Sequence, residues 1–108
     1  MDAFELQQLL DERRRAERSY LEFLRVPALS AGLYVLPAGA ADPQQPHTED
    51  EVYYIVSGRG AILVAGESRE VAAGSVVYVK ANDEHRFHSI AEELVILVFF
   101  APAEYSNQ

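Results

Sequence analysis

Residues 39–58 read GAADPQQPHTEDEVYYIVSG, and residues 74–89 read GSVVYVKANDEHRFHS. In the first stretch, His47 precedes Glu51 by four residues, at the head of a strand-like run. In the second stretch, His85 opens another such run. Two neutral imidazoles and one carboxylate arriving from separate strands are a common ligand set for a catalytic divalent metal. The rest of the chain must then supply a scaffold that brings the three side chains together.

The two runs also predict which side chains share a face. Successive side chains of a strand point to opposite sides, so Glu51 and Tyr53 face one way. By the same rule His85 and Phe87 share a face, and His88 lies on the opposite one. Apolar residues follow Glu51 on both faces, so we expect its strand to be buried on both sides. A buried acid is costly unless it is paired or bound to a metal.

The remainder of the chain changes from a helical to a strand-like pattern near Tyr20. Before it, an amphipathic helix is predicted from Asp2, its cap, to about Glu17. After it, β-rich runs alternate with turn residues. We expect strands near residues 20–26, 30–36, 51–57, 60–65, 68–72, 75–80, 85–90 and 94–101. One leading helix and many short strands favour a closed or sandwiched antiparallel sheet, whose interior holds side chains or one small ligand.

Composition excludes several classes of function. The chain has 108 residues, enough for one domain, and its nine basic against seventeen acidic residues give a charge of -8, which repels nucleic acid and anionic membrane surfaces. With no cysteine, disulfides and cysteine-type zinc sites are excluded. The N-terminus lacks an apolar secretion signal, and the longest apolar run, 94–101, is too short to cross a bilayer. We therefore expect a soluble cytoplasmic protein with neither nucleic-acid nor membrane partners.

The two quoted stretches resemble the two conserved motifs of the cupin family. In the first motif, a glycine and His-x-His are followed by a glutamate and a final glycine; His47 falls on the second histidine, Glu51 on the glutamate and Gly58 on the glycine. His85 falls on the histidine of the second motif. The resemblance implies an all-β, double-stranded β-helix, or jelly-roll barrel, with a short N-terminal helix. It implies a helix packed on the barrel over residues 1–18 and a single barrel domain over 19–108.

Two departures from the motifs concern the site. Gln45 stands where the first motif has its first histidine, and either an amide ligand or a hydrogen-bonding neighbour of the ligands fits that position. The ligand set that the resemblance implies is His47, Glu51, His85 and Gln45. In the second motif, Asn82 replaces a turn glycine, and asparagine tolerates the left-handed conformation that glycine would adopt. Such a set suits Fe(II), while Mn, Ni, Co and Zn stay open.

The same positions have simpler explanations. His47 and Glu51 also fit a surface ion pair in an acidic loop, where Glu49 and Asp50 are expected to be solvated charges. His88 is expected to be an exposed or hydrogen-bonded histidine and not a ligand. Ordinary core packing explains Tyr53 and Phe87 as well as a role in lining a substrate pocket does.

Two hypotheses for function follow. The first is a mononuclear metal-dependent enzyme of the dioxygenase, isomerase or lyase type, acting on a small metabolite inside the barrel, with Tyr53 and Phe87 lining the pocket. The second is a non-catalytic module that binds or senses a small molecule, with a structural metal or none. Whether the protein is an enzyme stays open, and no catalytic residue is assigned. The resemblance also implies a homodimer in which the apolar segment from Tyr20 to Leu36 crosses to its partner.

Overall fold

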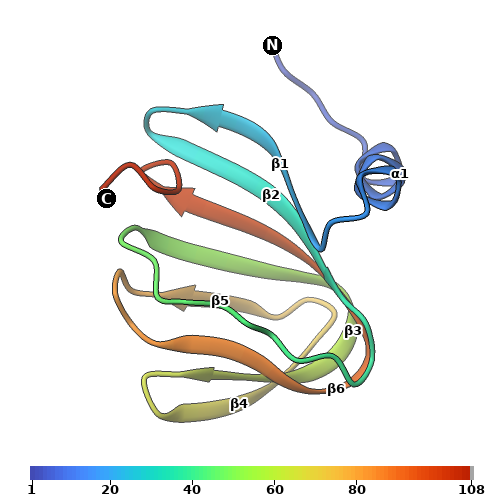
Figure 1. Ribbon diagram of the computed structural model, residues 1–108, viewed down its shortest axis with the longest axis vertical. Helices are drawn as coiled ribbons and strands as arrows, with labels where there is room; N and C mark the ends of the chain where they lie inside the picture. Colours follow the sequence, from blue (N-terminus) through green and yellow to red (C-terminus); the bar gives the residue numbers. More distant parts are fainter. Residues whose placement is uncertain (108) are drawn as a thin grey trace.

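A computed structural model describes residues 1–107 of the protein, and the architecture is the predicted all-β barrel with a leading helix. The elements are α1 (Leu6–Ala16), β1 (Tyr20–Val26), β2 (Leu29–Leu36), β3 (Asp50–Val64), β4 (Glu67–Ala72), β5 (Val76–Val79) and β6 (His85–Ala101). Every strand pairing is antiparallel, in the order β1-β2-β6-β3-β4, with β5 also paired to β3. Figure 1 shows this sheet curling over on itself, so that one face becomes an interior.

Two long strands produce the curl. The strands predicted near 51–57 and 60–65 are both parts of β3, and those near 85–90 and 94–101 are both parts of β6, so the prediction of separate strands is wrong there. The register between β3 and β6 shifts repeatedly around Gly58, which has φ 95°. A Cβ on Gly58 would lie 2.0 Å from the Glu93 carbonyl oxygen. Glycine therefore permits a bulge that bends the strand without ending it, and a turn signal and a bulge signal look alike in sequence.

Because each long strand bends, it forms part of both halves of the barrel. The first half of β3 pairs with β5 and with the second half of β6, whereas its second half pairs with β4 and the first half of β6. The inward side chains form one apolar core, which includes Tyr53, Phe87 and Phe100. The outward face of β3 is less covered, and Tyr54 is 40% exposed. The expectation that this strand is buried on both sides is therefore wrong.

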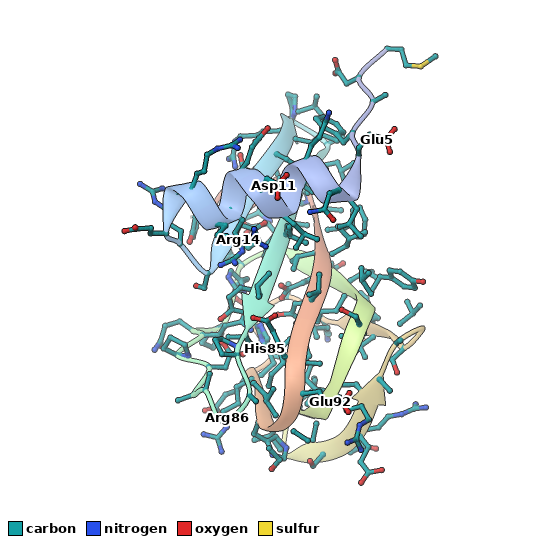
Figure 2. The ribbon with its side chains drawn as sticks, turned by 90° about the vertical axis from the view of Figure 1, so that its right-hand side faces the viewer. Glu5, Asp11, Arg14, His85, Arg86 and Glu92 are labelled. Atoms are coloured by element: carbon teal, nitrogen blue, oxygen red, sulfur yellow. The ribbon has the colours of Figure 1, made fainter. Side chains whose placement is uncertain are left out.

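The helix α1 lies across the outer face of the sheet (Figure 2). It packs there through Leu9, which joins Leu33, Val35 and Val95 in a second, smaller cluster. The helix begins at Leu6 and not at Asp2, and Glu5 is its N-cap residue, in an extended conformation and without a side-chain capping hydrogen bond. Within the described residues, no helix is long and apolar enough to cross a membrane.

Candidate metal centre

The fold brings His47, Glu51 and His85 together at one end of the barrel. His47 lies in the loop that precedes β3, Glu51 is the second residue of β3, and His85 is the first residue of β6. One ligand atom from each lies within 4.8 Å of the other two, so the group could hold a metal ion. The loop before β6 is tied to His47, because the Asn82 N–H donates to the His47 carbonyl at 2.7 Å. Asn82 has φ 69°, as its left-handed turn position predicted.

The His85 ring is oriented by its own backbone. Its Nδ1 lies 2.9 Å from the Asp83 carbonyl oxygen, which can only accept, so Nδ1 carries the hydrogen. In a neutral ring the lone pair is then on Nε2. That atom lies 3.1 Å from Glu51 Oε1 and 3.2 Å from Gln44 Oε1. A neutral His85 would thus direct a lone pair at two oxygen acceptors.

Glu51 is buried beside both histidine rings. Its side chain is almost fully buried, and within residues 1–107 neither carboxylate oxygen receives a hydrogen bond of good geometry, although both rings lie within ion-pair distance. Burial alone would raise the pKa of Glu51, but contacts with His47 and His85 lower it below its ordinary value. A buried carboxylate with no donor, facing ring nitrogens, can be stabilised by protons on those rings or by a cation between them. The donor set therefore fits a divalent metal.

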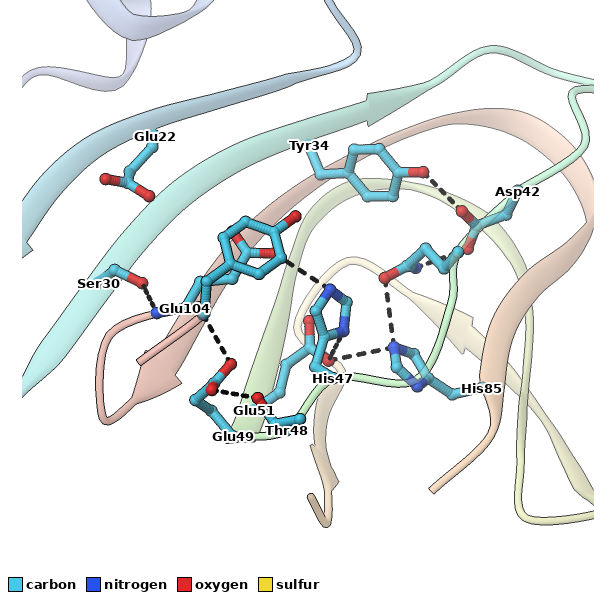
Figure 3. Close-up of polar contacts among 12 residues, drawn as sticks. Glu22, Ser30, Tyr34, Asp42, His47, Thr48, Glu49, Glu51, His85 and Glu104 are labelled. Carbon is cyan, nitrogen blue, oxygen red and sulfur yellow. Dashed lines mark hydrogen bonds and ion pairs between the residues drawn. The ribbon is translucent and has the colours of Figure 1, made fainter. Parts of the chain in front are cut away.

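His47 is held from both edges of its ring. Its Nδ1 lies 3.5 Å from Glu51 Oε1, and its Nε2 lies 3.1 Å from Glu104 Oε2 (Figure 3). Burial by itself lowers the pKa of His47, but the two glutamates outweigh it and raise the pKa to about 9. Burial lowers the pKa of His85 too, but Glu51 and the Asp83 carbonyl together outweigh it, so this pKa is also raised. In the absence of a cation, the protonated His47 ring compensates Glu51 at neutral pH.

The amide beside the ligand group belongs to Gln44. Its Nε2 donates to Asp42 Oδ2 at 2.7 Å, which turns its Oε1 toward His85 and toward the Tyr53 hydroxyl at 2.9 Å. Asp42 is buried and also accepts the Phe87 N–H at 2.8 Å. Gln45, the predicted position, lines the same cavity. The three-dimensional path of the loop brings the Gln44 amide to His85, and a ligand role of Gln45 stays a prediction.

An open cavity of about 460 Å³ adjoins the group. Its lining includes His47, Glu51 and Tyr53, together with side chains from distant parts of the chain: Ser19, Tyr20, Tyr34, Gln44, Gln45, Pro46, Val98, Phe100, Glu104 and Tyr105. Tyr20 reaches it from β1 because Gly32 leaves room, since a Cβ there would lie 2.1 Å from the Tyr20 hydroxyl oxygen. No lysine or arginine is among these lining residues.

The remaining predicted residues divide between core and surface. Phe87 is buried and packs edge-on against Tyr53, with ring centroids 4.9 Å apart, and it is not among the cavity-lining residues. His88 is on the outer side, where it contacts Ser68 and Ser89. The expectation that Glu49 is a solvated charge is wrong.

Glu49 is 2% exposed and accepts backbone N–H groups from the C-terminal turn. This turn, residues 102–107, carries Glu104 to the His47 ring. Sequence reasoning missed both residues because their contacts join segments far apart in the chain. Neither has a local spacing signal.

Comparison with known proteins bears on the same residues. Residues 32–100 match the family model described as the cupin domain. A protein of Streptomyces coelicolor, itself uncharacterised, is 53% identical over 104 residues, which cover 96% of this chain and 99% of that protein. The family match includes His47, Glu51 and His85, and ends before Glu104.

Solved structures share the fold. A Thermus thermophilus protein superposes with a TM-score of 0.74 at 24% identity, covering 95% of this chain and 99% of that one. The DMSP lyase DddQ from Ruegeria pomeroyi superposes with a TM-score of 0.66 at 25% identity, covering 70% of this chain and 39% of that one.

Proposed function

The chain belongs to the cupin family, and on that premise we propose that it is a mononuclear metal-dependent enzyme acting on a small metabolite. His47, Glu51 and His85 would hold the ion, and the adjoining cavity would take the substrate. When bound, the ion would supply Lewis-acid or oxygen-activating chemistry of the isomerase, lyase or dioxygenase type. Its identity among Fe, Mn, Ni, Co and Zn stays open.

One observation carries the proposal. Glu51 is buried, its Oε1 lies 3.1 Å from His85 Nε2, and within residues 1–107 neither carboxylate oxygen has a hydrogen bond of good geometry. The Asp83 carbonyl accepts from the His85 ring, and the Asn82 N–H donates to the His47 backbone carbonyl, so that both histidines are held beside Glu51. An arrangement that converges lone pairs on one point is the arrangement that a cation requires.

The chain's own residues would also bind and orient the substrate. Tyr20 presents a buried hydroxyl oxygen that has no hydrogen-bond partner within residues 1–107. Tyr53 is committed to Gln44 and helps to fix the amide beside His85. That DddQ, a DMSP lyase, shares the barrel supports an enzymatic role, whereas the substrate of this chain follows from neither the fold nor the cavity.

A second function is favoured by a different observation. The raised pKa of His47, about 9 despite burial, lets its protonated ring compensate Glu51 with no metal present. A binding or sensor module could use the cavity in that state. Protein that retains a co-purified metabolite at substoichiometric metal would support this alternative.

Metal titration of two paired variants tests the proposal. Glu51→Gln removes the buried carboxylate with little change of volume, and Asp50→Asn removes the neighbouring exposed one. We expect the first to lose affinity for Zn²⁺, Mn²⁺ and Fe²⁺ in calorimetry, and the second to bind as the parent does. Equal affinities of both variants would contradict the proposal.

The proposal also includes a homodimer. β1 lies at one end of the strand order, and Tyr54, Val76 and Tyr78 expose aromatic and aliphatic surface on β3 and β5. Gel filtration should give twice the chain mass, and elution at 12.0 kDa would contradict the dimer.

A further inference from the structure

Glu104 lies outside the ligand group and outside the family match, yet its carboxylate contacts one of the three side chains. Glu104 Oε2 is 3.1 Å from His47 Nε2, and Glu104 is 6% exposed. At the opposite edge of the ring, Nδ1 is 3.5 Å from Glu51 Oε1 and has no hydrogen-bond partner within residues 1–107. We propose that Glu104 is a positioning residue that holds the hydrogen of His47 on Nε2 and directs its Nδ1 lone pair at the metal. This inference rests on the proposed function.

The chemistry of the contact supports the assignment. An ionised carboxylate only accepts, so the ring nitrogen that faces it must donate. A neutral imidazole with its hydrogen on Nε2 has its lone pair on Nδ1, toward Glu51. Such a carboxylate–histidine contact fixes the ring and makes the other nitrogen a better ligand. His85 has the corresponding contact with the Asp83 carbonyl, so both rings would follow the same rule.

Glu104 is itself held in place by three elements. Its N–H donates to the Oγ of the fully buried Ser30 on β2 at 2.9 Å, and its carbonyl accepts from Arg25 Nη2 on β1 at 2.7 Å. The next N–H, that of Tyr105, donates to Glu49 Oε1 at 2.9 Å. Anchors on both sides of the residue fix the carboxylate before a metal arrives, which a positioning role requires.

A purely structural role makes a different prediction. If Glu104 only forms an ion pair with protonated His47, its removal lowers the stability of the metal-free protein. It then does not change which nitrogen of His47 binds the metal. If Glu104 positions the ring, its removal weakens metal binding, and the ion is bound through Nδ1 in the parent. Zinc affinity and the identity of the bound nitrogen therefore separate the two roles.

The experiment compares the parent with Glu104→Gln and Glu22→Gln. Glu22 provides a matched control, because it lies on β1, apart from His47 (Figure 3), and forms its ion pair with Arg25. Zn²⁺ affinity is measured by competition with a chromophoric chelator, and the His47 nitrogens of the zinc-loaded protein are assigned by ¹⁵N NMR. We expect Glu104→Gln to bind zinc about 10- to 100-fold more weakly and Glu22→Gln to match the parent. In the parent, zinc should lie on Nδ1, with an exchange-protected hydrogen on Nε2.

Each outcome decides something. Zinc on Nε2 of His47, or unchanged affinity in Glu104→Gln, would overturn this inference and leave the proposed function standing. No zinc binding by the parent would overturn both. The nitrogen assignment needs no variant, so a poorly folding Glu104→Gln would not prevent the test.

Discussion

The two histidines of the candidate metal centre are oriented by differently built regions. The His85 ring is fixed by the carbonyl of Asp83, two residues away in the same loop. The His47 ring contacts Glu104, which lies in the C-terminal turn and is far from His47 in the sequence. A contact within one motif depends only on that motif, whereas a contact between segments distant in sequence depends on the whole fold. The contact that orients the His47 ring can therefore be removed without substituting any of the proposed metal ligands.

Removal of His85 should have the largest effect on metal binding. Loss of a ligand should exceed the effect of losing a neighbouring contact, so we expect His85→Ala to weaken zinc binding by more than about 100-fold. His88→Ala is the control, because His88 is on the same strand with its ring on the outer side. Chelator competition gives both affinities. Similar zinc affinities in the two variants would contradict the assignment of His85.

Glu49→Ala should separate the C-terminal turn from the loop that carries His47. Its carboxylate accepts the Tyr105 and Asn107 N–H groups, both at 2.9 Å, in a buried position. Charge-assisted hydrogen bonds of this kind are the stronger ones, so we expect a loss of about 2–3 kcal/mol in the free energy of unfolding. Urea denaturation measures it. Asp50→Ala, which removes an exposed carboxylate with one backbone contact, should cost less, and an equal cost would refute the anchoring role.

The metal-free protein should lose stability as the pH rises, chiefly through the His47 side. The pKa of His47 in the fold, about 9, lies above its value of 6.5 in an unfolded chain, so its contribution is complete below pH 6.5 and is lost by about pH 9. The lowered pKa of Glu51 describes part of the same contact, whose contribution is lost as the pH falls through that pKa. We expect a decrease on the order of 2 kcal/mol from pH 6.5 to 9.

Chemical denaturation of chelator-treated protein across this pH range tests the prediction. His47→Gln should flatten the decrease. Bound zinc should reverse the trend, since a metal ligand must be unprotonated. A parent whose stability is unchanged from pH 6.5 to 9 would contradict the raised pKa of His47.

Ser30→Ala should give the smallest effect. It leaves the Glu104 N–H without its buried acceptor, at a cost of about 1 kcal/mol in unfolding free energy. Zinc affinity should fall less than in Glu104→Gln, because the carboxylate itself remains. Ser68→Ala, on the outer side next to His88, is the control and should change neither quantity. If Ser30→Ala binds zinc as tightly as the parent while Glu104→Gln binds it weakly, the hydrogen bond from Ser30 is not needed to anchor Glu104.

The same comparison explains what could be predicted from sequence. Strand alternation placed His85 and Phe87 on one face, and the structure buries both side chains. The resemblance to the family motifs brought His47, Glu51 and His85 into one group, as the structure has them. These are short-range patterns. The contacts of Glu104 and Glu49 depend on how a terminal turn folds over a distant loop, and no spacing encodes them.

One error has a local cause as well. Gly58 has the sequence signal of a turn, but its positive φ permits a bulge within β3. The contact of Gln44 with His85 has no sequence signal, because it depends on Asp42 orienting the amide, while a ligand role of Gln45 stays a prediction.

The proposed function depends on the binding of one divalent ion by His47, Glu51 and His85. Elemental analysis of tag-free protein, alongside a circular dichroism spectrum, tests it most directly in the parent and in His47→Ala. We expect about one ion per chain in the parent and almost none in the variant, with unchanged folding. Equal metal content in a folded His47→Ala and in the parent would contradict the claim.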